Sequence, residues 1–470
     1  MKQNLRLERI KVGKLFGRFN YDISLDNGYN VGILIAPNGC GKTTIFNLVN
    51  YMFNPSVSGF REIAKVPFIT CECTLSNGCV VSMRRRSTPN RQATRFRTSK
   101  LPNLHAGLEH GVIFAVDEKE YVELSMSIKN GKKKIDLNSE VKKEFEAELY
   151  YRDSLDEDPE MFEFDGVDVD DLPPSLRRRM RRDSLYFEYV KKILKKNDCD
   201  LAINYIRADR LHIQTYNDAY AYMSRREMSR KMDRDPITAI QTKTSELYKR
   251  ITDEYNTLQR DMKDRLPKMY LQMDTSTESM DFETFKKRWM RYLSNIEKYC
   301  DIGLLSSKQT ILEMDELEDA FSKHKAFLMV YLAAFEKTLA PLERDYKRLK
   351  LFVDILNRRN KVTRKVMKYG EEGIIVTVGG QKLPIECLSS GEKNDFVMFY
   401  NLVFDSQKNG LVLIDEPEIS LHIEWQEEYL DHLLDICNMN GLQAIVATHS
   451  PNIVNGHFEL YAERGLSDES

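Results

Sequence analysis

The chain has 470 residues, a length typical of two or three domains, and its hydrophobic content of 42% is sufficient for a folded core. Its formal net charge of −2 excludes a general electrostatic attraction to nucleic acid, so contacts of that kind would need local basic patches. The sequence has no apolar run long enough for a membrane span, no signal peptide and no disulfide framework. We therefore expect a cytoplasmic protein with free thiols and no membrane partner.

A nucleotide-binding loop is predicted at residues 36–44, which read APNGCGKTT. The run Val31 to Ile35 before it is typical of a buried parallel strand, and the residues after it have helical spacing. In this strand–loop–helix context the loop matches the phosphate-binding pattern G-x-x-x-x-G-K-[ST], with Ala36 in place of the first glycine. That position acts through its backbone conformation, which alanine can adopt if its φ is negative.

The chemistry of such a loop assigns its residues to ATP and Mg²⁺. Backbone N–H groups at the start of the helix face the phosphates. Lys42 is expected to reach the β- and γ-phosphates, and Thr43 to offer its hydroxyl to Mg²⁺. The nucleotide-binding residues predicted here are Asn38, Gly39, Cys40, Gly41, Lys42, Thr43 and Thr44.

Residues 60–150 have the pattern of strands joined by turns, with a hairpin signal at residues 76–78. Alternation in FITCECTL places Cys71 and Cys73 on one face of a strand. Together with Cys79 they form a C-x-C-x5-C cluster that matches no common zinc spacing, so we favour core packing over a metal site.

Two charged stretches leave alternatives open. Residues 84–100 hold six arginines and one lysine, which would suit either nucleic-acid phosphates or a solvated loop. Residues 151–183 are acidic and then basic, typical of a surface loop, with a partner-docking segment as the alternative. LAINYIRADRLH (201–212) then predicts a buried strand followed by charges, namely Arg207, Asp209 and Arg210, to which we assign no role.

Residues 215–356 are predicted to be mostly helical. An apolar seam steps by three and four from Leu328 to Leu356, and a shorter seam runs from Leu247 to Met262. Two such arms predict an antiparallel coiled-coil hairpin, with each arm at most about 65 Å long. Pro267 and Pro341 should kink or end helices, so a compact helical bundle is the alternative.

Three motifs in the last third of the chain complete an ATPase pattern. LSSGE, with Ser389, Ser390, Gly391 and Glu392, precedes a helix and suits an anion-binding cap. GLVLIDEP predicts a buried strand that ends in an acidic pair, in which Asp415 would support Mg²⁺ and Glu416 would activate water. QAIVATHSP predicts a second strand, and His449 at its end would contact the γ-phosphate. Glu416 and His449 are the predicted catalytic residues, and Thr43 and Asp415 the predicted metal ligands.

These motifs, in this order, resemble the heads of ABC-type ATPases, in the group that includes SMC-like, RecF-like and overcoming-lysogenization-defect ATPases. PEISLH followed by WQ, and THSPNIVN near the end, resemble the ATPase subunits of bacterial anti-phage systems, PtuA of Septu and AriA of PARIS. The resemblance implies an α/β fold: a P-loop head with a mixed sheet flanked by helices, an antiparallel β lobe and an inserted helical coiled-coil hairpin. The expected domains are residues 1–214 and 357–470, which form the head, and the insertion 215–356.

In that class the signature serine and glycine of one head complete the nucleotide site of another. The resemblance therefore implies a homo-oligomer in which Ser390 and Gly391 act in trans to Lys42, with residues 418–422 crossing the interface. Only 21 residues follow His449, so we expect no nuclease domain in this chain and a separate nuclease effector of HNH or Toprim/DUF4435 type. Nucleic acid or a phage component would be the trigger. The alternatives are a RecF/SMC-like DNA-repair ATPase that binds DNA directly and a scaffold that binds ATP without turnover.

Overall fold

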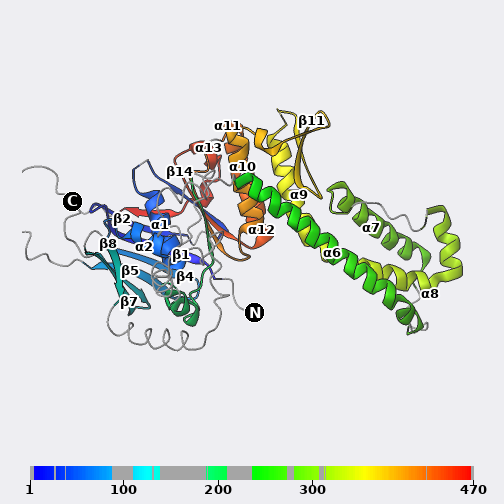
Figure 1. Ribbon diagram of the computed structural model, residues 1–470, viewed down its shortest axis with the longest axis horizontal. Coiled ribbons are helices and arrows are strands. Elements are labelled where there is room, and N and C mark those ends of the chain that lie inside the picture. Colours follow the sequence, from blue (N-terminus) through cyan, green and yellow to red (C-terminus); the bar gives the residue numbers. More distant parts are fainter. Residues whose placement is uncertain are drawn as a thin grey trace, which may run out of the picture. The chain divides into compact units, whose positions relative to one another are not determined.

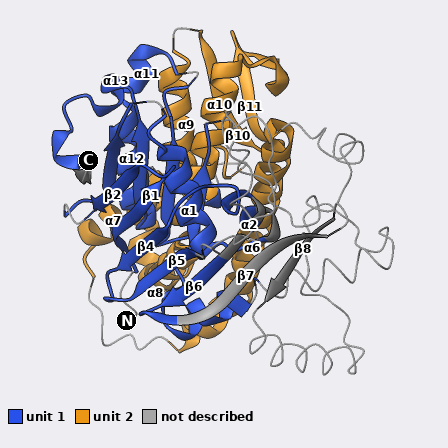
Figure 2. Ribbon diagram, turned by 90° about the vertical axis from the view of Figure 1, so that its left-hand side faces the viewer, with its two compact units in different colours: residues 1–233, 405–470 blue, residues 234–404 orange. Residues whose placement is uncertain are grey.

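The computed structural model describes most of the chain in two compact units, one of residues 1–233 with 405–470 and one of residues 234–404 (Figures 1 and 2). The described residues are 5–25, 28–37, 39–86, 110–129, 132–137, 187, 189–208, 236–272, 280–305, 312, 314–361, 363–419 and 421–466. The charged segment 151–183, most of the basic stretch 84–100, and Asn38, Asp209 and Arg210 lie outside them.

The first unit contains a four-stranded parallel sheet built from both ends of the chain. Its order is β3 (Val31–Ile35), β14 (Gln443–Thr448), β13 (Leu411–Asp415) and β9 (Ile203–Ile206). Every residue of β13 and β14 is buried, as expected for parallel strands that are covered on both faces. Helix α1 (Lys42–Phe53) packs against β13 and β9, and α12 (Tyr429–Asn440) packs against β3.

The same unit holds an eight-stranded antiparallel sheet. Its order is β15 (Glu463–Leu466), β2 (Phe19–Ser24), β1 (Leu7–Leu15), β4 (Thr70–Leu75), β5 (Val80–Arg86), β6 (His110–Val116), β7 (Lys119–Lys129) and β8 (Lys132–Leu137). Apolar side chains of β1, β4 and α1 share one core with those of β13 and β14. The unit also contains the short helices α2 (Val57–Ile63), α11 (Ile423–Glu427) and α13 (Pro451–Val454).

The predicted hairpin and the core packing of the three clustered cysteines are confirmed. β4 and β5 pair across the turn at residues 76–79, where Gly78 has a φ of 84°. Cys71 and Cys73 are fully buried on the same face of β4 and belong to the core. The expectation of free thiols is wrong for Cys79, which forms a disulfide with Cys199, 120 positions later. This bond joins the β4–β5 hairpin to the segment that leads into β9, a proximity that only the fold creates.

The second unit consists of long helices and a small sheet. The helices are α6 (Pro236–Leu271), α7 (Phe282–Asp301), α8 (Met314–Leu339), α9 (Leu342–Arg359) and α10 (Ser390–Tyr400). The antiparallel sheet is formed by β10 (Lys365–Gly370), β11 (Gly373–Val378) and β12 (Gln381–Leu383). Both α6 and α7 pack against α8, whereas α9 packs against β10 and α10. The helical insertion is confirmed, with at least three helices side by side rather than two arms alone (Figure 1).

The predicted apolar seam is buried but interrupted. Leu328, Leu332 and Phe335 in α8 and Leu349 in α9 are each at most 4% exposed, and the two helices are separated at Pro341, as predicted. Pro267, by contrast, does not end its helix, because α6 continues to Leu271.

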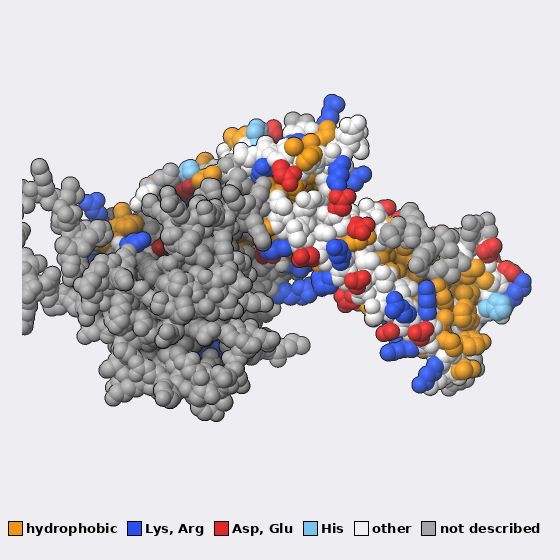
Figure 3. Space-filling model, viewed as in Figure 1, with side chains coloured by type: hydrophobic (Ala, Val, Ile, Leu, Met, Phe, Trp, Pro, Cys, Tyr) orange, Lys and Arg blue, Asp and Glu red, His pale blue; other side chains and the backbone are white. Residues whose placement is uncertain are grey.

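Apolar side chains are also exposed on the helical insertion. Tyr270, Leu271 and Met290 are 44%, 83% and 52% exposed, and Figure 3 shows hydrophobic side chains gathered over the end of this region. Exposed apolar groups of this kind are typical of contact surfaces. Among the described residues, none of the helices combines the length and the apolar character that a membrane crossing requires.

Candidate nucleotide-binding site

The carboxyl ends of the parallel strands bring the predicted motifs of the first unit together. The loop before Lys42 follows β3, His449 follows β14, and Glu416 follows β13. Ligands of open parallel sheets bind at this edge. Lys42 and Glu416, 374 positions apart, therefore lie at the same edge, on strands separated only by β14.

The described residues of the loop are compatible with phosphate binding. Gly39 and Gly41 have φ values of 84° and 85°, a region that favours glycine, whereas Ala36 is not among the described residues with a positive φ. Alanine at the first position of the motif is therefore compatible with this loop. The buried Lys42 ammonium donates to the carbonyl oxygens of Ala36, at 2.5 Å, and Pro37, at 3.3 Å. The Tyr21 hydroxyl donates to the carbonyl of Cys40 and so ties the loop to β2.

Asp415 lies beside the loop, as a magnesium-supporting carboxylate should. Its side chain is 2% exposed, and the Thr43 hydroxyl is close enough to act on its pKa. Burial raises the pKa of Asp415, and the neighbouring Glu416 charge adds to this, while Thr43 and Lys42 oppose the shift. A buried carboxylate whose pKa is raised by its surroundings gains from a nearby cation, so the Thr43–Asp415 pair is suited to hold Mg²⁺.

Glu416 and His449 occupy adjacent strand ends. Glu416 has a φ of 44°, and its N–H donates to the carbonyl of Ala447 at the end of β14. The Glu416 side chain is 23% exposed, and its Oε1 lies 3.9 Å from Nδ1 of His449. A carboxylate in this half-buried position can accept a proton from water, which is the role that sequence reasoning gave it.

The signature residues lie in the second unit, at the start of α10. Ser389 and Glu392 form a capping box, in which the Ser389 hydroxyl accepts from the N–H of Glu392 and the Glu392 carboxylate accepts from the N–H of Ser389. Lys365 of β10 donates to the same carboxylate at 2.6 Å. Burial alone would raise the pKa of Glu392, but the bonds from Lys365 and Ser389 outweigh it and lower that pKa. The buried Glu392 therefore stabilises the turn at the start of α10 through its hydrogen bonds to Ser389 and Lys365, while Ser389 and Ser390 are exposed.

Three residues near this edge of the sheet were not among the predicted site residues, although Glu418 belongs to the segment 418–422 that was expected to cross an interface between heads. The Tyr205 hydroxyl, in β9, lies 3.4 Å from Oδ2 of Asp415. Arg207, after the same strand, donates to the Asn47 side chain on α1 at 3.0 Å. Glu418 contacts His449 through its carboxylate at 2.9 Å. The only sequence signal for them was position: Tyr205 and Arg207 belong to the segment 201–212, which was predicted as a strand followed by charges, and Glu418 belongs to the PEISLH string.

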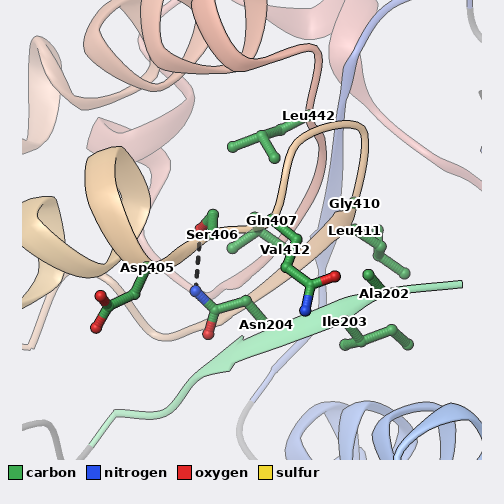
Figure 4. Close-up of a pocket in the computed structure, with 10 residues that line it drawn as sticks. All are labelled: Ala202, Ile203, Asn204, Asp405, Ser406, Gln407, Gly410, Leu411, Val412 and Leu442. Atoms are coloured by element: carbon green, nitrogen blue, oxygen red, sulfur yellow. Dashed lines mark hydrogen bonds between the residues drawn. The ribbon is translucent and has the colours of Figure 1, made fainter. Parts of the chain in front are cut away.

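A separate pocket of about 130 Å³ lies at the opposite edge of the parallel sheet (Figure 4). It is lined by the first residues of β9 and β13 and by the loop before β13, where Asn204 donates to the Ser406 hydroxyl at 2.9 Å. Because these are the amino ends of the strands, this pocket is not part of the nucleotide site.

Comparison with known proteins identifies the family. A family model described as an AAA ATPase domain, AAA_15, matches residues 7–454. The chain belongs to this ATPase family. A solved structure of the SmcHead bound to the C-winged helix domain of ScpA is also similar to the chain, with 11% identity over 98% of each chain and a TM-score of 0.33. This AAA_15 ATPase has the predicted fold class, a P-loop head of the ABC type with a helical insertion. Its family implies that it binds a nucleotide.

The donor set of this AAA_15 ATPase fits a nucleotide with Mg²⁺. The buried Lys42 ammonium and the N–H groups at the start of α1 supply positive charge, and Thr43 and Asp415 supply oxygen ligands. When bound, ATP supplies the phosphoanhydride bond that water cleaves. Glu416 is placed to take a proton from that water, and Lys42 to hold the phosphates in position.

Replacing Lys42 by alanine is expected to raise the dissociation constant for ATP–Mg²⁺ by about 10- to 100-fold. Hydrogen bonds to charged groups contribute about 1.5–3 kcal/mol, and each 1.4 kcal/mol is about tenfold in affinity. The measurement is titration with a fluorescent ATP analogue. Lys65→Ala, which removes an exposed lysine of the same unit, should leave the affinity unchanged. Equal affinities for Lys42→Ala and wild type would exclude the loop as the phosphate site.

Proposed function

We propose that this ATPase assembles through its heads when ATP binds, hydrolyses the ATP to separate them, and controls a separate nuclease effector in anti-phage defence. The single observation that supports head assembly is the exposed start of α10. Ser390 and Gly391 are accessible there, on a turn fixed by the Ser389–Glu392 capping box and by Lys365. Their N–H groups are the unsatisfied donors of a helix N-terminus, which suits an anion.

The Ser390→Glu variant tests assembly, because its carboxylate would repel a phosphate at this helix start. ATP-dependent self-association, measured by sedimentation in a Glu416→Gln background that retains ATP, is expected to weaken by about 100-fold, the effect of removing one dominant interface contact. Thr242→Glu adds the same charge at an exposed position of α6 and should associate normally. Normal assembly of Ser390→Glu would argue against the signature as the contact.

A mixing experiment decides whether the signature acts in trans. Lys42→Ala and Ser390→Glu are each expected to lack ATP turnover when alone. In a mixed pair, Ser390 of the first variant and Lys42 of the second would form one intact site. Turnover should therefore reappear on mixing. If it stays absent, the two motifs do not cooperate between chains.

The defence role rests on the resemblance of PEISLH, WQ and THSPNIVN to ATPase subunits of anti-phage systems. Its test begins with the neighbouring reading frame, which should encode an HNH, Toprim or DUF4435-type protein. Both genes expressed together should reduce phage plaque counts, and Lys42→Ala should abolish that protection. Tight binding of DNA by the purified ATPase without such a partner would favour the DNA-repair alternative instead.

A further inference from the structure

Two strings that the sequence singled out, PEISLH followed by WQ and THSP, hydrogen bond to each other in the fold. Glu418, just after β13, accepts from the Thr448 hydroxyl at 2.8 Å and from the N–H of His449 at 2.9 Å. The Ser450 hydroxyl donates to Oε1 of Gln426, on α11, at 2.7 Å. The segment after the acidic pair is therefore bound at two points to the segment that carries His449.

The carboxylate of Glu418 is directed at His449. Its side chain is 6% exposed, and Nδ1 of His449 lies 2.9 Å from Oε1, the same oxygen that accepts from Thr448 and from the His449 backbone. Among the described residues, the second oxygen, Oε2, is buried and accepts no hydrogen bond. The hydrogen bonds that the structure gives to this buried carboxylate thus come from Thr448 and His449. We therefore ask how Glu418 acts on the segment that carries His449.

A carboxylate this close to one ring nitrogen can select the tautomer of His449. A hydrogen bond on one ring nitrogen fixes the tautomer and leaves the other nitrogen available. At 2.9 Å from the buried Oε1 of Glu418, Nδ1 is the ring nitrogen on which this carboxylate would hold a proton, which would leave Nε2 available to the site. The same contact also keeps the ring from Glu416, whose Oε1 is 3.9 Å from Nδ1, beyond hydrogen-bond distance. Without Glu418, the carboxylate closest to the His449 ring would be that of Glu416, which is the residue placed to accept a proton from water.

We propose that Glu418 is a positioning residue for ATP hydrolysis, which holds Nδ1 of His449 as a donor, directs Nε2 to the nucleotide phosphates and keeps the ring off Glu416. This inference rests on the proposed ATP hydrolysis at this site. A buried residue that only stabilises the fold would also be sensitive to substitution. The tests therefore need readouts that report on the ring and on coupling between residues.

The first test needs no nucleotide. Full-length protein labelled with ¹⁵N-histidine is compared with Glu418→Ala, and the His449 signals are assigned from their loss in His449→Asn. Wild type should show Nδ1 of His449 protonated, and Glu418→Ala should shift both ring nitrogens towards averaged values. Glu418→Gln, whose amide oxygen can still accept, should keep the wild-type pattern. His449 signals that do not change in Glu418→Ala would overturn the proposal.

The second test is kinetic. Partners that orient a functional histidine typically change activity by about 10- to 100-fold. Glu418→Ala should lower kcat by that factor with little change in KM, and Glu418→Gln should restore most of the loss. In a His449→Ala background, Glu418→Ala should cause no further loss, because it acts through the ring. An equal loss in both backgrounds would overturn the proposal, and Glu427→Gln, at an exposed position of α11, serves as the charge-matched control.

The two tests distinguish a failure of the proposed ATP hydrolysis from a failure of the role proposed for Glu418. If wild type does not hydrolyse ATP, the proposed function fails, while the ¹⁵N spectra still decide whether Glu418 sets the tautomer of His449. If wild type hydrolyses ATP and the spectra or the coupling are negative, only the role of Glu418 is rejected. Thermal unfolding of each variant identifies a loss that arises from misfolding.

Discussion

Replacing Glu416 by glutamine is expected to lower ATP turnover by about 100- to 10,000-fold, the contribution of a well-placed general base. Glutamine preserves the size of the side chain and the strand-end geometry, in which the N–H of residue 416 donates to Ala447, but it cannot take a proton from water. ATP affinity should remain close to wild type, because Lys42 and the loop are unchanged. Phosphate release measures turnover, and a fluorescent ATP analogue measures affinity.

The control for this prediction is Glu427→Gln, which removes an exposed carboxylate from α11 and should leave turnover unchanged. Two outcomes would reject Glu416 as the base. One is equal phosphate release by Glu416→Gln and wild type. The other is a loss of ATP binding as large as the loss of turnover, which would indicate a structural role.

Replacing Arg359 by methionine is expected to destabilise the second unit by about 3–5 kcal/mol, the cost of leaving one charge of a buried pair without its partner. Arg359, at the end of α9, donates to Asp395 of α10 at 2.9 Å, and the two side chains are 1% and 3% exposed. The guanidinium also lies 4.7 Å from the ring centroid of Phe399. The pair therefore joins the helical insertion to the helix that begins with the signature, and both of its side chains are buried.

The measurement is the free energy of unfolding in urea for the transition that includes this unit. The double variant Arg359→Met with Asp395→Leu should recover much of the loss, because no buried charge then remains. Lys350→Ala breaks an exposed ion pair with Asp354 on the same helix and should cost less than about 0.5 kcal/mol. A small effect of Arg359→Met would mean that water reaches the pair.

The sequence was most informative where a function depends on residues close together in the chain. The loop motif that contains Lys42 occupies nine consecutive positions, 36–44, and the pair Asp415–Glu416 ends an apolar run, so both could be read from spacing. Glu418 and His449 are 31 positions apart, and Tyr205 is 210 positions from Asp415, so neither contact has a spacing pattern. The Cys79–Cys199 disulfide was missed for the same reason. Pro267 does not end its helix, because α6 continues through it to Leu271, four residues later.

The order of strands in the parallel sheet has a consequence for biosynthesis. β3 is made early, but its partner β14 ends at Thr448, 413 positions after Ile35. At about 5–20 residues per second, the ribosome needs roughly 20–80 s to deliver that partner. Throughout that interval the nascent chain carries β3 without its partner strand and the phosphate-binding loop without Asp415 and Glu416. A chain that is truncated before Asp415 would therefore lack residues that ATP hydrolysis needs. Such a fragment is expected to be inactive rather than active without control.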